Sequence, residues 1–310
     1  IQSLIEAAGL SERRMTSTTV AFGICPRINA AGRMGSADRA IRLLLSEDYE
    51  EANALAQEIN DENATRQQTE QEILNQAVAQ IKNNPNWIYQ NVLVVAGEGW
   101  HDGVVGIVAS RLVEKYGKTT LVITVDGDDA KGSGRSIDGF NLYDALSHCG
   151  ECLTHFGGHM LAAGIGLKTE NIGTFRKAIN EYADSFEMPF PIQTVDFKLN
   201  PAYVNVEMLS AIEQLEPFGA GNPQPVFGLY NMTITDIQPI RNGKHLRIIL
   251  ERNGVSLQTL KFRTLQADFP YVKGDVIDAA VGLEPNEYLG QLRVSVLLKN
   301  IKLHDMVEDD

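Results

Sequence analysis

A glycine-rich segment near the middle of the chain carries the residue types best suited to holding a ligand. Residues 156–164 read FGGHMLAAG, with three glycines, one histidine and two alanines. Glycines let backbone N–H groups approach a ligand, and small residues after His159 would let a helix begin tightly against its neighbour. Gly157, Gly158 and His159 could therefore offer donors to a phosphate or a base. The alternative is a helix or strand end in which the glycines serve packing and His159 caps the terminus.

A second segment pairs an arginine with a hydroxyl. Arg135 and Ser136 follow Gly132-Ser133-Gly134, a sequence that predicts a flexible turn. Because a guanidinium matches phosphate geometry with two hydrogen bonds, Arg135 is the residue expected to grip a phosphate. A mobile surface loop is the alternative. The spacing of Gly127 and Gly132 is also that of a nucleotide-binding P-loop, but the required Lys-Ser/Thr does not follow, which argues against a nucleoside triphosphatase.

Two further places could contribute to the same chemistry. Arg27, Asn29 and Arg33 flank small residues in a segment expected to be a loop, where they could line a cleft. Either arginine could instead form a structural salt bridge. His101 follows Trp100 just after a predicted strand, a position at which loops of α/β domains carry functional groups. A histidine satisfied within the core is the alternative there.

Zinc binding is considered because Cys149, Cys152, His155 and His159 have suitable types and spacing. Closed zinc sites normally draw their ligand pairs from separated segments, and His159 already belongs to the glycine motif, so the sequence favours no metal in this chain. With Cys25, the cysteines number three, which does not indicate a disulfide framework and fits a reducing compartment.

A basic segment occurs in the last third of the chain. Residues 241–263 hold six basic residues against one acidic residue, Glu251. Lys and Arg beside exposed rings are typical of a single-stranded nucleic-acid surface. Solvated strand edges also favour such residues, which is the alternative for each one singly. The candidate residues are Arg241, Lys244, His245, Arg247, Arg252, Lys261, Phe262 and Arg263, with His245 and Phe262 available for base stacking.

Composition places the chain in the soluble globular class, with 310 residues, 44% of them hydrophobic and 22% charged. No apolar run is long enough to span a bilayer and no secretory pattern is present, so a cytoplasmic location is expected. The net charge of −13 argues superficially against a nucleic-acid partner. However, much of the acid is concentrated in one predicted helix and in the tail Glu308-Asp309-Asp310.

Periodicity predicts an α/β region followed by a β region. A short helix is expected over residues 1–8, another over 38–45, and one long connector helix over 47–82. Strands and helices then alternate, which indicates an α/β domain with a mixed sheet. The expected strands are 92–96, 121–124 and 162–167, and the expected helices are 103–116, 141–148 and 172–186.

A boundary is expected at Pro189-Phe190-Pro191, followed by a strand at 195–199 and a helix at 207–216. Five short β-rich runs then predict a five-stranded OB-type barrel, a fold that binds oligonucleotides. These runs are 230–237, 245–251, 255–262, 276–283 and 292–302. The expected divisions are 1–45 as the end of a preceding domain, 46–86 as the connector, 87–190 as the α/β domain and 191–310 as the barrel domain.

Several motifs in this order resemble a known family. FGGHMLAAG resembles the GGHxxAAG signature of the DHH-associated domain in the DHH phosphoesterase superfamily. Four other segments resemble the RecJ family of single-stranded-DNA exonucleases within it: PRINAAGR at 26–33, WHDGVVGI at 100–107, GSGRS at 132–136 and LEPFG at 215–219. The resemblance covers nearly the whole chain.

The resemblance implies a processive nuclease that degrades single-stranded DNA from its 5′ end in repair and recombination. Two Mn²⁺ or Mg²⁺ ions would be held by a separate upstream domain whose Asp-His-His triplet is absent from these residues, so this chain would bind DNA without cutting it. The segments at Arg135 and at Gly157 to His159 would hold terminal nucleotides. A monomer is expected, and a single-stranded-DNA-binding protein is a possible partner.

Two other functions stay open at this point. The chain could be a stand-alone nucleic-acid-binding module, or part of a phosphodiesterase for short oligonucleotides or cyclic dinucleotides, because those enzymes share the glycine–histidine motif. The expected OB-type domain and the segment 26–33 favour the exonuclease.

Overall fold

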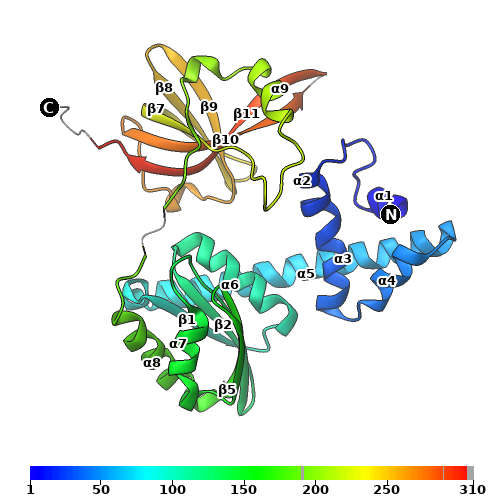
Figure 1. The fold of residues 1–310 in the computed structure, drawn as a ribbon, viewed down its shortest axis with the longest axis vertical. Helices are drawn as coiled ribbons and strands as arrows, with labels where there is room; N and C mark the ends of the chain where they lie inside the picture. The colour runs from blue at the N-terminus through cyan, green and yellow to red at the C-terminus, as the bar shows by residue number, and fades with distance from the viewer. Residues whose placement is uncertain (190–191, 289, 306–310) are drawn as a thin grey trace. The chain divides into compact units, whose positions relative to one another are not determined.

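The computed structural model describes residues 1–189, 192–288 and 290–305, and its backbone forms two compact units, residues 1–191 and 192–310 (Figure 1). Part of the expected boundary, Phe190-Pro191, lies outside the described residues, as does the acidic tail at 308–310.

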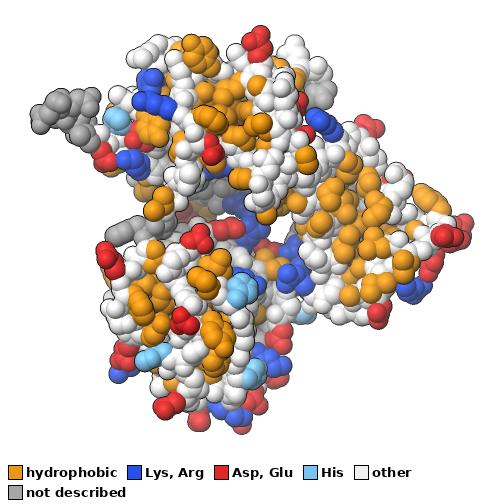
Figure 2. Space-filling view, in the orientation of Figure 1, with side chains coloured by type: hydrophobic (Ala, Val, Ile, Leu, Met, Phe, Trp, Pro, Cys, Tyr) orange, Lys and Arg blue, Asp and Glu red, His pale blue; other side chains and the backbone are white. Residues whose placement is uncertain are grey.

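The first unit begins with short helices packed on one long helix. These are α1 (Gln2–Ala7), α2 (Ser17–Thr19) continued by a π-helical turn (Val20–Ile24), α3 (Cys25–Met34) and α4 (Asp38–Leu45). Leu4, Ile24 and Leu43 are buried against the first half of the long helix. Large apolar side chains remain exposed on the other side of these helices, with Phe22 80% and Leu45 75% exposed. Figure 2 shows hydrophobic atoms gathered over this region.

The expectation of a loop over residues 26–33 is wrong, because the segment is helical in α3. Pro26 stands in the first turn, where its missing N–H leaves no hydrogen bond unmade. Ala30 and Ala31 are fully buried, and their small side chains let α3 lie close to its neighbours. Burial of this face outweighs the low helix propensity of Gly32.

The expected connector helix is confirmed as α5 (Tyr49–Asn83), a helix of 35 residues and about 52 Å. The Asp48 side chain caps it by accepting from the Glu51 N–H at 2.8 Å. Its first half contributes Leu55 and Ile59 to the cluster of the N-terminal helices, and its second half contributes Ile73 and Ala77 to a cluster beneath the sheet. None of the described helices, α5 included, is both long and apolar enough to cross a membrane.

The expected mixed sheet is confirmed, with strand order β1-β2-β3-β5-β4. The β1–β2 pair is parallel, and the other three pairs are antiparallel. The strands are β1 (Val92–Glu98), β2 (Thr119–Asp126), β3 (Asp129–Arg135), β4 (His155–His159) and β5 (Ala162–Lys168). The helices of this domain are α6 (Asp102–Tyr116), α7 (Leu142–His148) and α8 (Ile172–Asp184).

The two faces of this sheet are covered unequally. One face packs on α7 and α8 through residues such as Leu121, Ile165 and Phe175. The other packs on α5 and α6 through Leu93 and Val122, but this cover reaches only as far as β3. On that side β4 and Gly164 of β5 are exposed to solvent, which creates a surface on which a ligand could lie.

Two glycine-rich segments that were expected to be irregular are strands. The predicted flexible turn at 132–134 lies inside β3, which is paired on both sides. The predicted helix start after His159 is instead a hairpin, because β4 turns at Met160 and Leu161 directly into β5. Gly132 makes room for Ile123, Gly134 for Leu142 and Gly158 for the backbone of β5, so tertiary packing decides the conformation in both places.

The second unit is the expected OB-type barrel. It opens with β6 (Phe197–Lys198) and α9 (Val206–Glu213). Five longer strands follow in the order β10-β11-β9-β8-β7, and pairing of β10 with β7 closes the barrel around a core that includes Leu229, Ile248 and Val281. These strands are β7 (Phe227–Ile240), β8 (His245–Arg252), β9 (Val255–Lys261), β10 (Val276–Tyr288) and β11 (Gln291–Leu303).

Candidate phosphate-binding site

Strand β3 presents alternate residues to the open face of the sheet. Ala130 is buried against α7 and α8, and a Cβ on Gly132 would lie 2.9 Å from Ile123 Cγ1 on that side. Because side chains alternate along a strand, Lys131, Ser133 and Arg135 point to the opposite face. One basic residue at each end and a hydroxyl between them therefore line the open side of β3.

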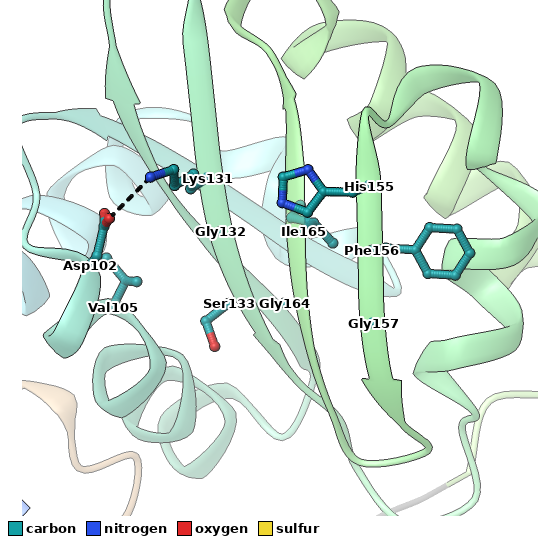
Figure 3. A pocket seen from close by; sticks show the side chains of 10 residues that line it. All are labelled: Asp102, Val105, Lys131, Gly132, Ser133, His155, Phe156, Gly157, Gly164 and Ile165. Carbon is teal, nitrogen blue, oxygen red and sulfur yellow. Dashed lines mark ion pairs between the residues drawn. The ribbon is translucent and has the colours of Figure 1, made fainter. Parts of the chain in front are cut away.

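The floor of this site is made of glycine. Gly157 on β4 and Gly164 on β5 are paired in register, and Gly164 is in turn paired with Ser133. A Cβ on Gly157 would meet nothing within 4 Å, and one on Gly164 would meet only a carbonyl at 3.9 Å. The backbone is therefore bare, and the hollow above it has a volume of about 470 Å³. Figure 3 shows α6 with Asp102 and Val105 on one side of this trough and β4 on the other.

Arg135 lies two residues along β3 from Ser133, just beyond the residues that line the trough, and is half-buried beside α6. Its Nη1 donates to Ser133 Oγ at 3.0 Å and to the Gly134 carbonyl at 2.7 Å. A Cβ on Gly106 of α6 would lie 3.0 Å from Arg135 Nη2, so a side chain at position 106 would push the guanidinium aside. Burial lowers the pKa of Arg135, and the nearby charge of Arg33 lowers that pKa further.

Arg33 brings a second positive charge from α3 to the same place. Its Nη1 donates to the Gly103 carbonyl at 3.1 Å, and a Cβ on Gly103 would collide with the Arg33 carbonyl oxygen. The end of α3 is thus fixed against the start of α6. Across the described ranges, no carboxylate forms an ion pair with Arg33 or Arg135. Two adjacent guanidinium groups without an acid are suited to an anion.

His159 stands across the trough from Arg135. The two residues are in register through Ala162, with β5 between them, so their Cα atoms are about 10 Å apart. His159 is exposed, and its Nδ1 accepts from the Leu161 N–H at 3.4 Å. Gly158 has a φ of 149° and packs against β5, which fixes the strand that carries His159.

Ser136, which the sequence pairs with Arg135, makes its hydrogen bonds away from the open face. Its Oγ donates to the Phe140 carbonyl at 2.8 Å and lies 2.8 Å from Thr119 Oγ1. As the residue after Arg135 it faces the other side of the sheet, where it ties β2 to the loop before α7. The hydroxyl beside Arg135 is that of Ser133.

The other residues predicted from the first half of the chain serve mainly as structural contacts. Arg27 donates from Nε to Asn60 Oδ1 at 2.9 Å and from Nη1 to the Gly23 carbonyl at 2.5 Å, and burial lowers its pKa. His101 caps α6, because its Nδ1 accepts from the Gly103 N–H at 3.1 Å. Asn29 is exposed on α3. Of the segment 26–33, the structure brings Arg33 to the trough.

The zinc alternative fails on geometry. Cys149 is buried in the cluster with α7 and α8, whereas His155 and His159 lie on the open face across the sheet. In the part of the chain that the structure describes, no three His, Cys, Asp or Glu side chains are grouped as metal ligands.

The buried thiol of Cys149 should be the least reactive of the cysteines. Burial, followed by the neighbouring Cys152, raises the pKa of Cys149 to about 11, so only roughly 0.1% is thiolate at pH 8. In the folded chain at pH 8, its alkylation should be more than tenfold slower than in urea. Mass spectrometry of alkylated peptides measures this rate for each cysteine, and equal rates for Cys149 in both states would contradict the burial argument.

The barrel groups part of the predicted basic strip at one end. Arg241 and Lys244 lie in the turn between β7 and β8, and Phe262 and Arg263 follow β9 beside them. The His245 ring meets the Phe262 ring edge-on at 5.1 Å, and its Nδ1 accepts from the Arg263 N–H at 2.9 Å. Phe262 is 45% exposed, so its ring is accessible for stacking.

Three other residues of the strip are placed differently. Lys261 Nζ donates to the Lys299 carbonyl at 2.5 Å, and burial lowers its pKa. Arg252 Nη1 donates to the Tyr230 carbonyl at 2.7 Å at the far end of β8. Arg247 is half-buried on β8. Nucleic-acid binding by the strip therefore stays a prediction that concerns mainly the Arg241 to His245 and Phe262 to Arg263 end.

Sequence reasoning missed Ser133, Lys131 and, except as a zinc ligand, His155. The available signal was alternation: once 129–135 is taken as a strand, every second residue shares the face of Arg135. The glycines at 132 and 134 hid that signal, since glycine is unfavourable in strands generally.

Comparison with known proteins identifies both domains. Residues 84–185 match the family model of the DHHA1 domain, and residues 195–300 match that of the RecJ OB domain. The chain is 35% identical over 306 residues to the single-stranded-DNA-specific exonuclease RecJ of Bacillus subtilis, an alignment that covers 97% of this chain and 39% of that protein. The corresponding protein of Escherichia coli is 28% identical, with 97% of this chain and 54% of that protein covered.

Solved structures give the same result. The crystal structure of RecJ from Thermus thermophilus in complex with Mn²⁺ aligns with a TM-score of 0.80 and 28% identity, covering 98% of this chain and 44% of that chain. The Mg²⁺ complex aligns with a TM-score of 0.78 over 98% and 46%, respectively. The chain thus spans about half or less of the length of these relatives. Residues 84–185 therefore form a DHHA1 domain and residues 195–300 an OB domain of the RecJ type, and the chain is similar to RecJ exonucleases over 97% of its length.

Proposed function

We propose that this chain forms the substrate-gripping part of a 5′→3′ single-stranded-DNA exonuclease that acts in DNA repair and recombination. The observation that carries the proposal is the pair Arg33 and Arg135 beside a bare glycine floor, with no carboxylate paired to either among the described residues. Such a site binds a phosphate closely and does not discriminate between bases. The relatives described as single-stranded-DNA-specific exonucleases fit this chemistry.

Each residue of the trough has a separate role in this proposal. Arg135 and Arg33 neutralise a phosphate, and Ser133 orients the guanidinium of Arg135. His159 lies at the other wall. The exposed basic end of the barrel binds the strand further along, and its contacts to phosphate give affinity without sequence preference. In this proposal the protein is cytoplasmic and monomeric, and its partners are single-stranded DNA and a single-stranded-DNA-binding protein.

The metal ions of the proposed reaction are assigned outside this chain. Crystal structures of RecJ contain Mg²⁺ or Mn²⁺. The residues of the described ranges provide no group of three suitable ligands, so they do not fit such ions. We therefore assign no bond-breaking step to them, and we expect this chain alone to bind DNA without cutting it. Residues 1–45 would then end a preceding catalytic domain, with 46–86 as connector, 87–190 as DHHA1 domain and 191–310 as OB domain.

The closed barrel gives a reason to prefer long DNA over short or cyclic dinucleotides as the substrate. A dinucleotide leaves the basic end of the barrel without a role, whereas a longer strand supplies phosphates for both that end and the trough. The second candidate function is a stand-alone nucleic-acid-binding module. Under this alternative the chain has the same affinity for single-stranded DNA but acts without a nuclease domain.

Salt-dependent binding of fluorescent single-stranded DNA tests the proposal. Fluorescence anisotropy of the 310-residue chain with a 5′-phosphorylated dT₁₅, without metal, should show affinity that falls steeply with salt, because phosphate contacts release counterions. A duplex of the same length is the control and should bind more weakly. Equal affinity for both, or no binding at low salt, would refute the gripping role.

A further inference from the structure

His155 occupies an unusual place on the open face. It is exposed, and its ring extends from β4 across Gly166 of β5. A Cβ on Gly166 would lie 2.6 Å from His155 Nδ1 and closer still to Cε1, so the imidazole lies against bare backbone. The Thr154 hydroxyl lies 3.2 Å from Nδ1, which helps to hold the ring. Figure 3 shows the ring leaning over the sheet towards Lys131.

The surroundings of this ring favour a neutral partner over a phosphate. Lys131 is partly neutralised by Asp102, with Nζ and Oδ2 3.8 Å apart, as Figure 3 shows. The hollow beyond His155, of about 780 Å³, is lined by Glu98, Asp126 and Asp129. Asp129 is paired with Lys168 at 2.6 Å, but Glu98 and Asp126 repel a phosphate. Carboxylates can instead accept hydrogen bonds from the amino groups of bases.

The trough beneath the ring suits a flat, partly apolar group. Val105 of α6 contributes apolar surface, and Gly164 leaves the floor open. His155 and Lys131 lie opposite each other across Gly166, and His159 and Arg135 lie opposite each other across Ala162. The two pairs are four residues apart along the strands, a distance of about 13 Å. This separation is longer than the span from phosphate to base within one nucleotide.

We propose that His155 is a stacking platform for a nucleobase of the strand whose phosphate Arg135 holds, the base belonging to a neighbouring nucleotide. The inference rests on the proposed function, because it needs a strand in the trough. Stacking on a ring accepts any base, since every base has a π-face. The site thus combines a charged subsite at Arg135 with an aromatic one at His155, separated by glycine.

Substitutions at His155 separate stacking from charge. His155→Ala should weaken binding of a 5′-phosphorylated dT tetramer, carrying a 3′ fluorophore, by about tenfold, as expected for one stacked base. His155→Phe keeps a ring without a charge and should retain wild-type affinity. If phenylalanine lost as much affinity as alanine, His155 would act through charge and the stacking proposal would be wrong.

An abasic tetramer provides the matched ligand. We would compare tetramers that each lack the base at a different position. The tetramer that lacks the stacked base should bind the wild-type chain about tenfold more weakly than the intact tetramer. With that tetramer, His155→Ala should cause no further loss of affinity. Equal losses with intact and abasic tetramers would overturn the proposal. Gly166→Ala gives an independent test, because its methyl group displaces the ring without removing it and should reproduce the His155→Ala loss.

Comparing Arg135→Ala with His155→Ala distinguishes a wrong phosphate assignment from a wrong stacking assignment. If Arg135→Ala leaves tetramer binding unchanged while His155→Ala weakens it, the phosphate assignment is wrong and a base site stands alone. If Arg135→Ala weakens binding and His155→Ala does not, the gripping function stands and the stacking platform is refuted. A wild-type chain that binds no tetramer at millimolar concentration refutes both.

Discussion

Replacing Arg135 with alanine should weaken the binding of 5′-phosphorylated single-stranded DNA by about 30-fold. Hydrogen bonds to a charged group contribute about 2 kcal/mol, which corresponds to that factor at 25 °C. The buried side of this guanidinium is already held by Ser133 and Gly134, so little ordering is needed when a phosphate arrives. Arg135→Lys keeps the charge but loses the two-pronged geometry, and its affinity should fall between those of wild type and alanine.

Salt titration and a control arginine make this result specific. The slope of log affinity against log salt should fall by about 0.7 in Arg135→Ala, the value for one phosphate contact in single-stranded DNA. Arg111 on α6 is bonded to Glu70 at 3.1 Å, and Arg111→Ala should leave the slope unchanged. An unchanged slope in Arg135→Ala would show that this residue contacts no phosphate.

Replacing Gly157 or Gly158 with alanine should have different effects on the free energy of unfolding, although the two residues are adjacent. A Cβ on Gly158 would collide with the Ala162 carbonyl oxygen and lie 2.5 Å from Ala163 Cα, and the residue has a φ of 149°. Backbone atoms cannot easily move away, so Gly158→Ala should lower the free energy of unfolding by about 3 kcal/mol. Gly157 faces open space, so Gly157→Ala should change that free energy by less than about 0.5 kcal/mol.

The measurement can be confined to the first unit. Both tryptophans, Trp87 and Trp100, lie in residues 1–191, so their fluorescence in a urea titration reports this unit alone. Gly157→Ala should fold normally yet weaken DNA binding, because its methyl group stands on the floor of the trough. If Gly158→Ala were as stable as Gly157→Ala, the close packing of β4 on β5 would be incorrect.

Most elements of the fold were predictable because their patterns are strong. The long α5 contains no glycine or proline, and β1 is a short apolar run between turn signals. The barrel followed from five short β-rich segments. The errors concentrate where glycine is abundant, as at Gly132. Local propensity indicates flexibility there, but the missing side chain makes room for Ile123 in the core.

The site was predictable in its charge and motif, but less so in its geometry. Arg135 and Arg33 were identified from residue type, and the structure places them together. The sequence predicted a flexible turn that presents Arg135 and Ser136, but residue 135 ends a strand, so Ser133 and not Ser136 shares the face of Arg135. His155 could not be recognised as a surface group without knowing that Gly166 lies opposite it on β5.

Helix α5 contributes to two hydrophobic clusters, and this affects where the protein can be divided into fragments that fold independently. The DHHA1 family match begins at residue 84, yet Ile73, Ala77 and Ile81 fill the cluster under that sheet. Excision at the family boundary would strip those side chains from the domain and expose Leu93 and Val95. Leu55 and Ile59, in the first half of the same helix, pack against the N-terminal helices. Helix and sheet therefore share one cooperative folding unit, although sequence families place a border between them.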